Sequence, residues 1–315
     1  MKKSILLLLI TLNAHIYAEE HIPKQDIHFK TYLTPSIPQE LYKLIADYIN
    51  KTTCLNIILS FELIHSGPPK NMFDPFSSEK IDIAHICSPP FIWLTAHDEP
   101  SVELLPIAPI FNDERAHGKP VYFSDIIVAS NSPIKNFDEL KGKTWCYNDP
   151  ESLSGYFCML QKLAHIKQTP SFFSTIYKSG SHLRSIQLVA NGTIDGSAID
   201  SNVLALQYKK HPELKEKIRI IKSWGPFPIQ PLVVKKDLPD EIKKIFVTAL
   251  LQMAIDEKDA LAEYFVDGFG PISDHDFDDE RKLLRDCDSI IDTIKKENLL
   301  RIFIAQYNPF YATIR

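Results

Sequence analysis

"WCYNDPESLSGYF", residues 145–157, links a strand-like run to a helix-like run through Asp-Pro, two serines and a glycine. Because the first turn of a helix exposes unpaired N–H groups and the positive end of its dipole, such a junction can hold an anion. Ser152 and Ser154 add hydroxyl donors to it, and Gly155 lets the backbone come close to a ligand. A plainer interpretation, in which a serine only caps the helix, stays open at this point.

Strand-like and helix-like runs alternate along most of the chain. Alternating or densely apolar runs predict strands at 27–33, 55–61, 81–87, 102–110, 121–130, 143–148, 172–178, 193–199 and 218–224. Helical spacing predicts helices at 38–50, 89–97, 154–166, 181–192, 202–210 and 238–256, with a single turn at 136–142. This order predicts an α/β fold with helices on mainly parallel sheets.

The end of the chain indicates how these units are grouped. After the strand at 218–224 it offers one more strand, 226–236, and then helical sequence to about Asn298. Because one strand cannot form a sheet alone, that strand must join an earlier sheet. We therefore predict a two-lobed clamshell with two hinge crossings and a ligand cleft between the lobes. Lobe one comprises 19–112 and 225–315, and lobe two comprises 113–224.

The first segment, "MKKSILLLLITLNAHIYAEE", has the layout of a secretory signal peptide. Two lysines precede an apolar run over residues 5–12, and a small residue, Ala18, ends the polar stretch that follows. The apolar run is much shorter than the ~20 residues that a membrane span needs. We predict that residues 1–18 are removed and that the mature chain is a periplasmic monomer. A buried N-terminal helix is the alternative.

Charge and cysteine content argue against several classes of protein. A formal net charge of −5 gives no broad attraction to nucleic acid. The cysteines are odd in number, so at least one is unpaired unless it pairs between chains. They form no CxxC pair and no cysteine–histidine cluster of zinc spacing, so we predict no metal and no cofactor. The five are Cys54, Cys87, Cys146, Cys158 and Cys287.

A serine nucleophile is the enzymatic alternative for the opening stretch. Ser154 could be combined with His182 and Asp195 into a triad, but nearly any chain of this length offers such a trio. The run Ser-Leu-Ser-Gly also lacks the first glycine of the GxSxG elbow that strains and exposes a nucleophile. We therefore predict that the chain is not an enzyme.

A second junction follows in "SGSHLRSIQLVANGTIDGSAID", residues 179–200. His182 stands next to Ser181 between a strand and a helix, which predicts that it faces the same rim as the first junction. A histidine there is usually a surface residue, but beside an anion it can donate an N–H, or a charge if protonated. Asp200, at the end of the next strand, can cap a helix or accept a bond from a ligand hydroxyl or amine.

Taken in order, four motifs resemble the phosphate/phosphite/phosphonate-binding proteins of ABC importers, which are type 2 periplasmic binding proteins. The motifs are "FDELKGKTWCYNDPESLSGYF", "SGSH", "VANGTIDGSAIDS" and "GPFPIQPLVVKKDLPDEIK", and the likeness runs from about Ile27 to Ile255. The resemblance implies a receptor that closes its two lobes on a small, anionic molecule and presents it to a membrane ABC permease. It equally fits a sensory receptor of the same shape that reports its ligand to a membrane kinase.

The resemblance also implies the residues of the first half of the ligand site. The family's loop typically reads Asp-Pro-x-Ser-Thr-Ser-Gly-Tyr and holds phosphonyl oxygens with hydroxyl and backbone N–H groups. Ser152, Ser154, Gly155 and Tyr156 match it, whereas Leu153 stands where threonine is usual. The histidine of the family's Gly-Ser-His motif matches His182.

Aromatic side chains of lobe one line the cleft in this family. By position, Phe61 and Phe91 replace two tyrosines, and Tyr122 keeps its hydroxyl. With Leu153, this removes three hydroxyl donors, and a charge-assisted hydrogen bond contributes ~1.5–3 kcal/mol. The predicted cleft is therefore more apolar than is usual in the family. It fits a phosphonate ester, another organic anion or an uncharged, aromatic or pyrimidine-like ligand.

Overall fold

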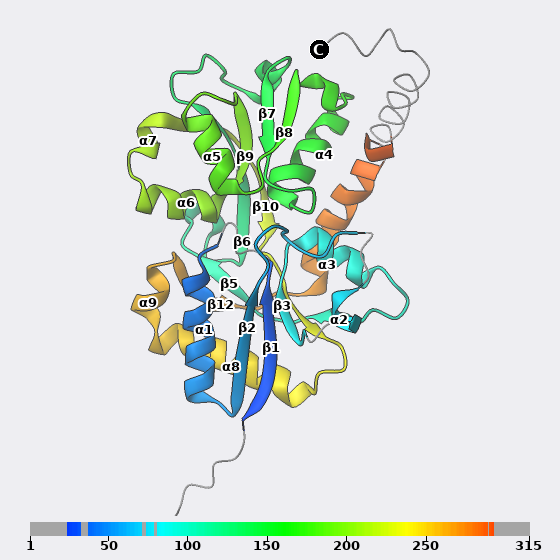
Figure 1. Cartoon of the computed structure of the whole chain (residues 1–315), viewed down its shortest axis with the longest axis vertical. Helices are drawn as coiled ribbons and strands as arrows, with labels where there is room; N and C mark the ends of the chain where they lie inside the picture. Colours follow the sequence, from blue (N-terminus) through cyan, green and yellow to red (C-terminus); the bar gives the residue numbers. More distant parts are fainter. Residues whose placement is uncertain (1–23, 33–36, 71–73, 79–80, 289, 293–315) are drawn as a thin grey trace, which may run out of the picture.

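The computed structural model describes residues 24–32, 37–70, 74–78, 81–288 and 290–292. Within these ranges the chain forms two five-stranded sheets, one above the other, each flanked by helices (Figure 1). Among the described residues, no helix combines the length and apolarity needed to cross a bilayer. The predicted signal peptide and the end of the chain from residue 293 lie outside the described residues.

The sheet of lobe one has the order β2-β1-β3-β11-β4. Its strands are β1 (Gln25–Thr31), β2 (Leu55–Phe61), β3 (Ile83–His85), β4 (Val102–Leu104) and β11 (Leu232–Lys235). Helices α1 (Gln39–Thr52) and α8 (Asp240–Asp256) pack together against it. The other helices of this lobe are α2 (Pro75–Ser78), α3 (Ser88–Thr95) and α9 (Lys258–Ala262).

The sheet of lobe two has the order β10-β6-β9-β7-β8. Its strands are β6 (Val121–Ala129), β7 (Thr144–Tyr147), β8 (Thr175–Lys178), β9 (Gly196–Asp200) and β10 (Ile218–Pro228). Helices α5 (His182–Ala190) and α6 (Ser201–Lys210) cover one face and α4 (Cys158–His165) the other (Figure 1). The short helices η1 (Glu114–Ala116), η2 (Phe137–Leu140), η4 (Pro170–Phe172) and α7 (Leu214–Lys217) lie in the connections.

The sheets are mixed, although the sequence predicted mainly parallel ones. Within the described ranges each sheet has two parallel and two antiparallel pairings. The antiparallel pairings come from the segments that cross between lobes. Strand β11 enters lobe one against the direction of β3, and strands β6 and β10 run in opposite directions beside each other. Strand β10 stays in the lobe-two sheet as far as Pro228, past the predicted boundary at residue 224.

The segment predicted as a strand at 102–110 forms two strands in different sheets. Pro106, which lacks the N–H that a ladder needs, lies between β4 and β5 (Ala108–Phe111). Strand β5 pairs with β12 (Val266–Gly270), in a segment that the sequence predicted to be helical. Two glycines in "VDGFG" disfavour a helix, and pairing with β5 decides the conformation.

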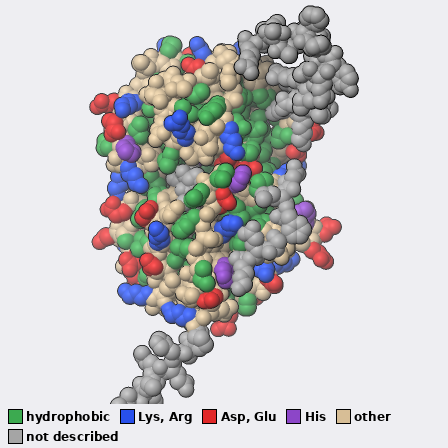
Figure 2. Space-filling view, viewed as in Figure 1, with side chains coloured by type: hydrophobic (Ala, Val, Ile, Leu, Met, Phe, Trp, Pro, Cys, Tyr) green, Lys and Arg blue, Asp and Glu red, His purple; other side chains and the backbone are tan. Residues whose placement is uncertain are grey.

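Aromatic rings fill the core of each lobe. In lobe two the fully buried Trp145 ring lies 5.2 Å from Phe173 and 5.9 Å from Phe137. In lobe one Phe29 makes edge contacts with Tyr42 and Phe246, with centroids 6.1 and 6.0 Å away. On the surface seen in Figure 2, acidic and basic side chains are interspersed.

A C-terminal helix follows η5 (Asp274–Phe277) and is helical over 278–288 and 290–292. It runs beside both lobes and is orange in Figure 1. Its Glu280 is 1% exposed, and neither carboxylate oxygen has a hydrogen-bond partner within the described part of the chain. Burial raises the pKa of Glu280 to about 8, while the nearby Ser88 hydroxyl acts in the opposite direction. All five cysteines are free, and only Cys54 is exposed.

The raised pKa of Glu280 predicts a pH-dependent stability. The folded chain retains a proton that the unfolded chain releases, so the free energy of unfolding should fall as pH rises from about 4.5 to about 8. Glu280→Gln should therefore stabilise the chain at pH 8, on the order of 2–4 kcal/mol, with a gain that shrinks towards pH 4.5. Urea unfolding at both pH values measures this, with the exposed neighbour Asp279→Asn as the control. Equal pH dependence in parent and Glu280→Gln would contradict it.

Candidate ligand-binding site

A small cavity of about 20 Å³ lies where the two lobes meet. Its volume corresponds to about one water molecule, so the lobes are nearly closed on each other. Ser66 and Cys87 line it from lobe one, and Gln230 lines it from the crossing between β10 and β11. Lobe two contributes the larger part: Asn148, Asp149, Ser152, Ser154, Gly180, Ser181, His182, Asp200 and Val203.

The loop after β7 has the predicted strand-to-helix character. Its helix begins with the π-helical segment η3 (Leu153–Phe157) and continues as α4. Ser152 is the N-cap residue of η3, and its Oγ accepts a hydrogen bond from Gly155 N at 3.1 Å. Ser124 Oγ on β6 donates to Ser154 O at 2.8 Å and so ties the loop to the sheet. Ser152 therefore caps the helix and also lines the cavity, and π-helical turns are frequent at functional sites.

Gly155 is required by the way this loop packs. A Cβ atom at this position would lie 1.9 Å from Asn148 Oδ1 and 3.2 Å from His182 Cε1. Asn148 cannot easily move away, because it is buried and its Nδ2 donates to Asp149 Oδ2 at 3.2 Å. Because Gly155 has no side chain, the loop backbone can pack directly against Asn148 and His182.

Ser154, at the junction after β7, lies next to His182, at the junction after β8. Ser154 Oγ lies 3.3 Å from His182 Nε2, and both residues are buried. His182 Nδ1 is buried as well and has no hydrogen-bond partner among the described residues. Burial lowers the pKa of His182 to about 3, so the imidazole is neutral at neutral pH. Of the two roles open from the sequence, a neutral donor or acceptor fits this environment and a cation does not.

Two carboxyl groups also line the cavity. Asp200 caps α6 by accepting from Asn202 N at 2.8 Å, and its Oδ2 accepts from Gln230 Nε2 at 2.6 Å. Asp149 Oδ2 accepts from Ser66 Oγ of lobe one at 2.5 Å. Burial raises the pKa of Asp200 to about 6 and holds the pKa of Asp149 well above its usual range. No lysine or arginine is among the described residues that line this cavity.

The other predicted site residues lie around this cavity or away from it. Leu153 is fully buried, and its N–H points to Cys87 Sγ at 3.4 Å. Tyr122 is buried near Phe227, and its hydroxyl has no hydrogen-bond partner among the described residues. Ser181 lines the cavity and caps α5, because its Oγ accepts from Arg184 N at 3.1 Å.

The aromatic residues proposed for the cleft do not line this cavity. Phe61 is half-buried at the end of β2. Phe91 is fully buried in α3, with its ring 5.0 Å from Phe277. Tyr156 packs on Tyr147 at 4.7 Å and faces a larger neighbouring cavity. A phenyl ring without a hydroxyl gains from full burial, so Phe91 occupies a packing position.

Sequence reasoning missed four polar residues of the site. Asn148 and Asp149 stand in the opening stretch itself, directly after the strand, where polar side chains at a carboxyl edge could have been noticed. Ser66 and Gln230 come from segments far away in the sequence. Only the closure of the lobes brings those two to the cavity.

Comparison with known proteins places this geometry in a family. Residues 28–277 match the periplasmic substrate-binding proteins of ABC phosphonate transporters. The chain belongs to this family. Its members are substrate-binding transport proteins of type 2 periplasmic-binding-protein fold, which implies an extracytoplasmic location.

Several solved structures have the same fold as this chain, although their sequences are less than 20% identical to it. A binding protein of an ABC phosphonate transporter from Pseudomonas aeruginosa is 19% identical, with a TM-score of 0.71 over 92% of this chain and 98% of that one. PhnD1 from Prochlorococcus marinus, in complex with methylphosphonate, is 14% identical, with a TM-score of 0.66 over 83% and 97%. A Xanthomonas citri protein bound to ATP is 16% identical, with a TM-score of 0.63 over 85% and 99%.

Gly155→Ala should disrupt the site by steric conflict. The added methyl group overlaps Asn148, so we expect a loss of about 1–3 kcal/mol in the free energy of unfolding, measured in urea. Gly268→Ala is the matched control, because its Cβ would lie at an ordinary 3.5 Å from Ala254 Cβ. If both variants unfold at the same urea concentration as the parent, the close approach at Gly155 is not a constraint.

Proposed function

We propose that this chain is an extracytoplasmic solute-binding protein that delivers a phosphonate-, phosphite- or phosphate-like ligand to the membrane permease of an ABC importer. The observation that carries the proposal is the meeting of Ser154 with His182, 3.3 Å apart, at the start of a helix and between two lobes. Family membership supports the transport role. Methylphosphonate in the Prochlorococcus marinus relative supports the ligand class.

Ligand binding requires the cavity to change shape, because about 20 Å³ does not hold a phosphonate. Hydrogen bonds between Ser66 and Asp149, and between Leu153 and Cys87, join the lobes. We infer that these contacts break as the lobes separate and that closure around the ligand follows. Ser154, the unpartnered His182 Nδ1 and the N–H groups of η3 then face the ligand oxygens.

The charge of the cavity constrains the ligand. His182 is neutral, and the two carboxyl groups bear negative charge whenever they are deprotonated. Because none of the described residues that line the cavity is lysine or arginine, the site binds a dianion only through N–H and O–H dipoles, which favours a singly charged phosphonate or phosphonate ester. The same feature supports a second candidate, an uncharged pyrimidine-like ligand whose N–H groups would donate to Asp149 or Asp200.

Titration of the full chain with methylphosphonate, phosphite, inorganic phosphate and uracil tests both candidates. Trp93 lies at the lobe contact, with its ring 5.9 Å from Phe157 of lobe two, so its fluorescence should report a change in closure. We expect a saturable response to one of the phosphorus oxyanions. Ser152→Ala combined with Ser154→Ala should weaken that binding by at least about 100-fold, because two hydroxyl groups at the anion site are lost.

The exposed Ser171→Ala is the matched control and should bind like the parent. Unchanged affinity in the double variant would remove these serines from the site. A response to uracil alone would replace the anionic ligand with the pyrimidine-like one. No response to any of the four compounds by fluorescence or calorimetry would contradict both candidates.

A further inference from the structure

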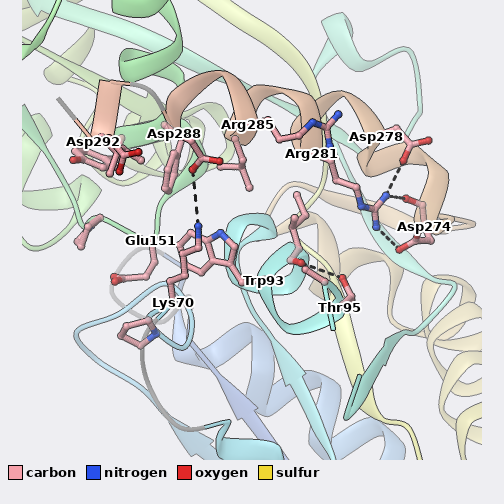
Figure 3. A pocket seen from close by; sticks show the side chains of 18 of the residues that line it. Lys70, Trp93, Thr95, Glu151, Asp274, Asp278, Arg281, Arg285, Asp288 and Asp292 are labelled. Atoms are coloured by element: carbon pink, nitrogen blue, oxygen red, sulfur yellow. Dashed lines mark hydrogen bonds and ion pairs between the residues drawn. The ribbon is translucent and has the colours of Figure 1, made fainter. Parts of the chain in front are cut away.

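A second and much larger cavity, about 1120 Å³, lies beside the ligand site (Figure 3). Lobe one lines it with Lys70 and Trp93, and lobe two lines it with Glu151 and Tyr156. The C-terminal helix, described over 278–288 and 290–292, forms the remaining wall (Figure 3). Anything that fills this cavity therefore touches both lobes and the C-terminal helix at once.

The inner surface of this cavity is apolar. Trp93 and Phe157 meet edge to face across the lobes, and the half-buried Tyr156 lies next to them. Leu284 and Ile291 of the C-terminal helix also line the cavity. Apolar surface in a cavity of this size is a typical feature of a binding surface for another chain segment.

The rim of the cavity carries more acidic than basic side chains. Its basic residues are largely neutralised: Arg281 pairs with Asp274 and Asp278 at 2.5 and 2.8 Å, and Lys70 lies 4.0 Å from Asp288 (Figure 3). The acidic lining residues are Glu151, Asp274, Asp278, Asp288 and Asp292, against Lys70, Arg281 and Arg285. An occupant with apolar side chains and positive charge complements this surface.

The chain itself continues with such a segment. Asp292 lines the cavity and is followed by residues 293–315, "TIKKENLLRIFIAQYNPFYATIR". These contain four basic residues and one acidic residue, and apolar and aromatic side chains recur from Leu299 to Ile314. An extended residue spans about 3.3 Å, so ten residues span ~30 Å. Residues 293–315 are therefore long enough to turn back from Asp292 into the cavity.

We propose that residues 299–315 dock in this cavity as an intramolecular strap that touches both lobes and the C-terminal helix. The family match ends at residue 277, so the helical wall and its occupant both lie beyond the part that matches the family. The cavity shares Glu151 and Tyr156 with the loop that carries Ser152 and Ser154, so a docked strap would lie next to the ligand site. The proposal does not depend on the identity of the ligand.

Hydrogen–deuterium exchange of the full chain without ligand tests the strap. Phe303→Asp combined with Phe310→Asp removes apolar contacts and adds negative charge facing an acidic rim. We expect backbone exchange over 92–96, 150–157 and 281–288 to become at least about fivefold faster. Ile255→Asp, at a 72% exposed position outside the cavity, is the matched control and should leave these segments unchanged.

Exchange over the strands β7 and β9 shows whether the double variant is folded, because these strands lie away from the cavity. If it is not, Arg301→Glu, which keeps every apolar side chain, should give a smaller increase over the same segments. Equal exchange in parent and folded variants would overturn the strap. Protection that depends on protein concentration would also overturn it, because the occupant would then be the tail of a second copy.

Discussion

The close approach of the Gly155 backbone to Asn148 and His182 is the constraint on which the site depends. It places the start of the η3–α4 helix against the second junction and sets Ser154 within 3.3 Å of His182. The same approach excludes water from both groups, which keeps the imidazole neutral. A side chain at position 155 would separate the junctions and let solvent in. The geometry and the electrostatics of the site thus have one cause.

Much of this site was predictable because its signals are local. A strand followed by Asp-Pro, two serines and a glycine gives a helix N-terminus with a capping serine, and "SGSH" gives a second one. Both junctions belong to parallel strands of one sheet, so their ends meet at one edge. Ser66 and Gln230 were not predictable. Their positions depend on how two lobes close, which no run of neighbouring residues encodes.

The fold was predicted less well where tertiary pairing overrides local preference. The segment "VDGFG" follows a long helix, and only the edge of β5 makes it a strand. Pro106 splits an apolar run that reads as one strand. The mixed sheets follow from the two crossings, since a segment that returns to a lobe can enter its sheet in either direction. The aromatic residues show the same dependence on tertiary contacts. An apolar ring predicts that Phe91 is buried, but the ring packs against Phe277, which lies far away in the sequence.

The C-terminal helix, which begins after the end of the family match, contacts both lobes. Cys287 Sγ donates to Phe157 O at 3.6 Å, and Glu280 is buried beside Ser88 of lobe one and Cys158 of lobe two. These contacts fix the helix to the end of the ligand loop and to the start of α3 together. If the lobes opened as rigid bodies, the helix would lose one of its two partners and the Glu280 carboxyl would be exposed to water. Burial of this carboxyl costs free energy in the closed arrangement and so favours opening. Contacts that cross both lobes on the helix side stabilise the closed arrangement and so offset this cost.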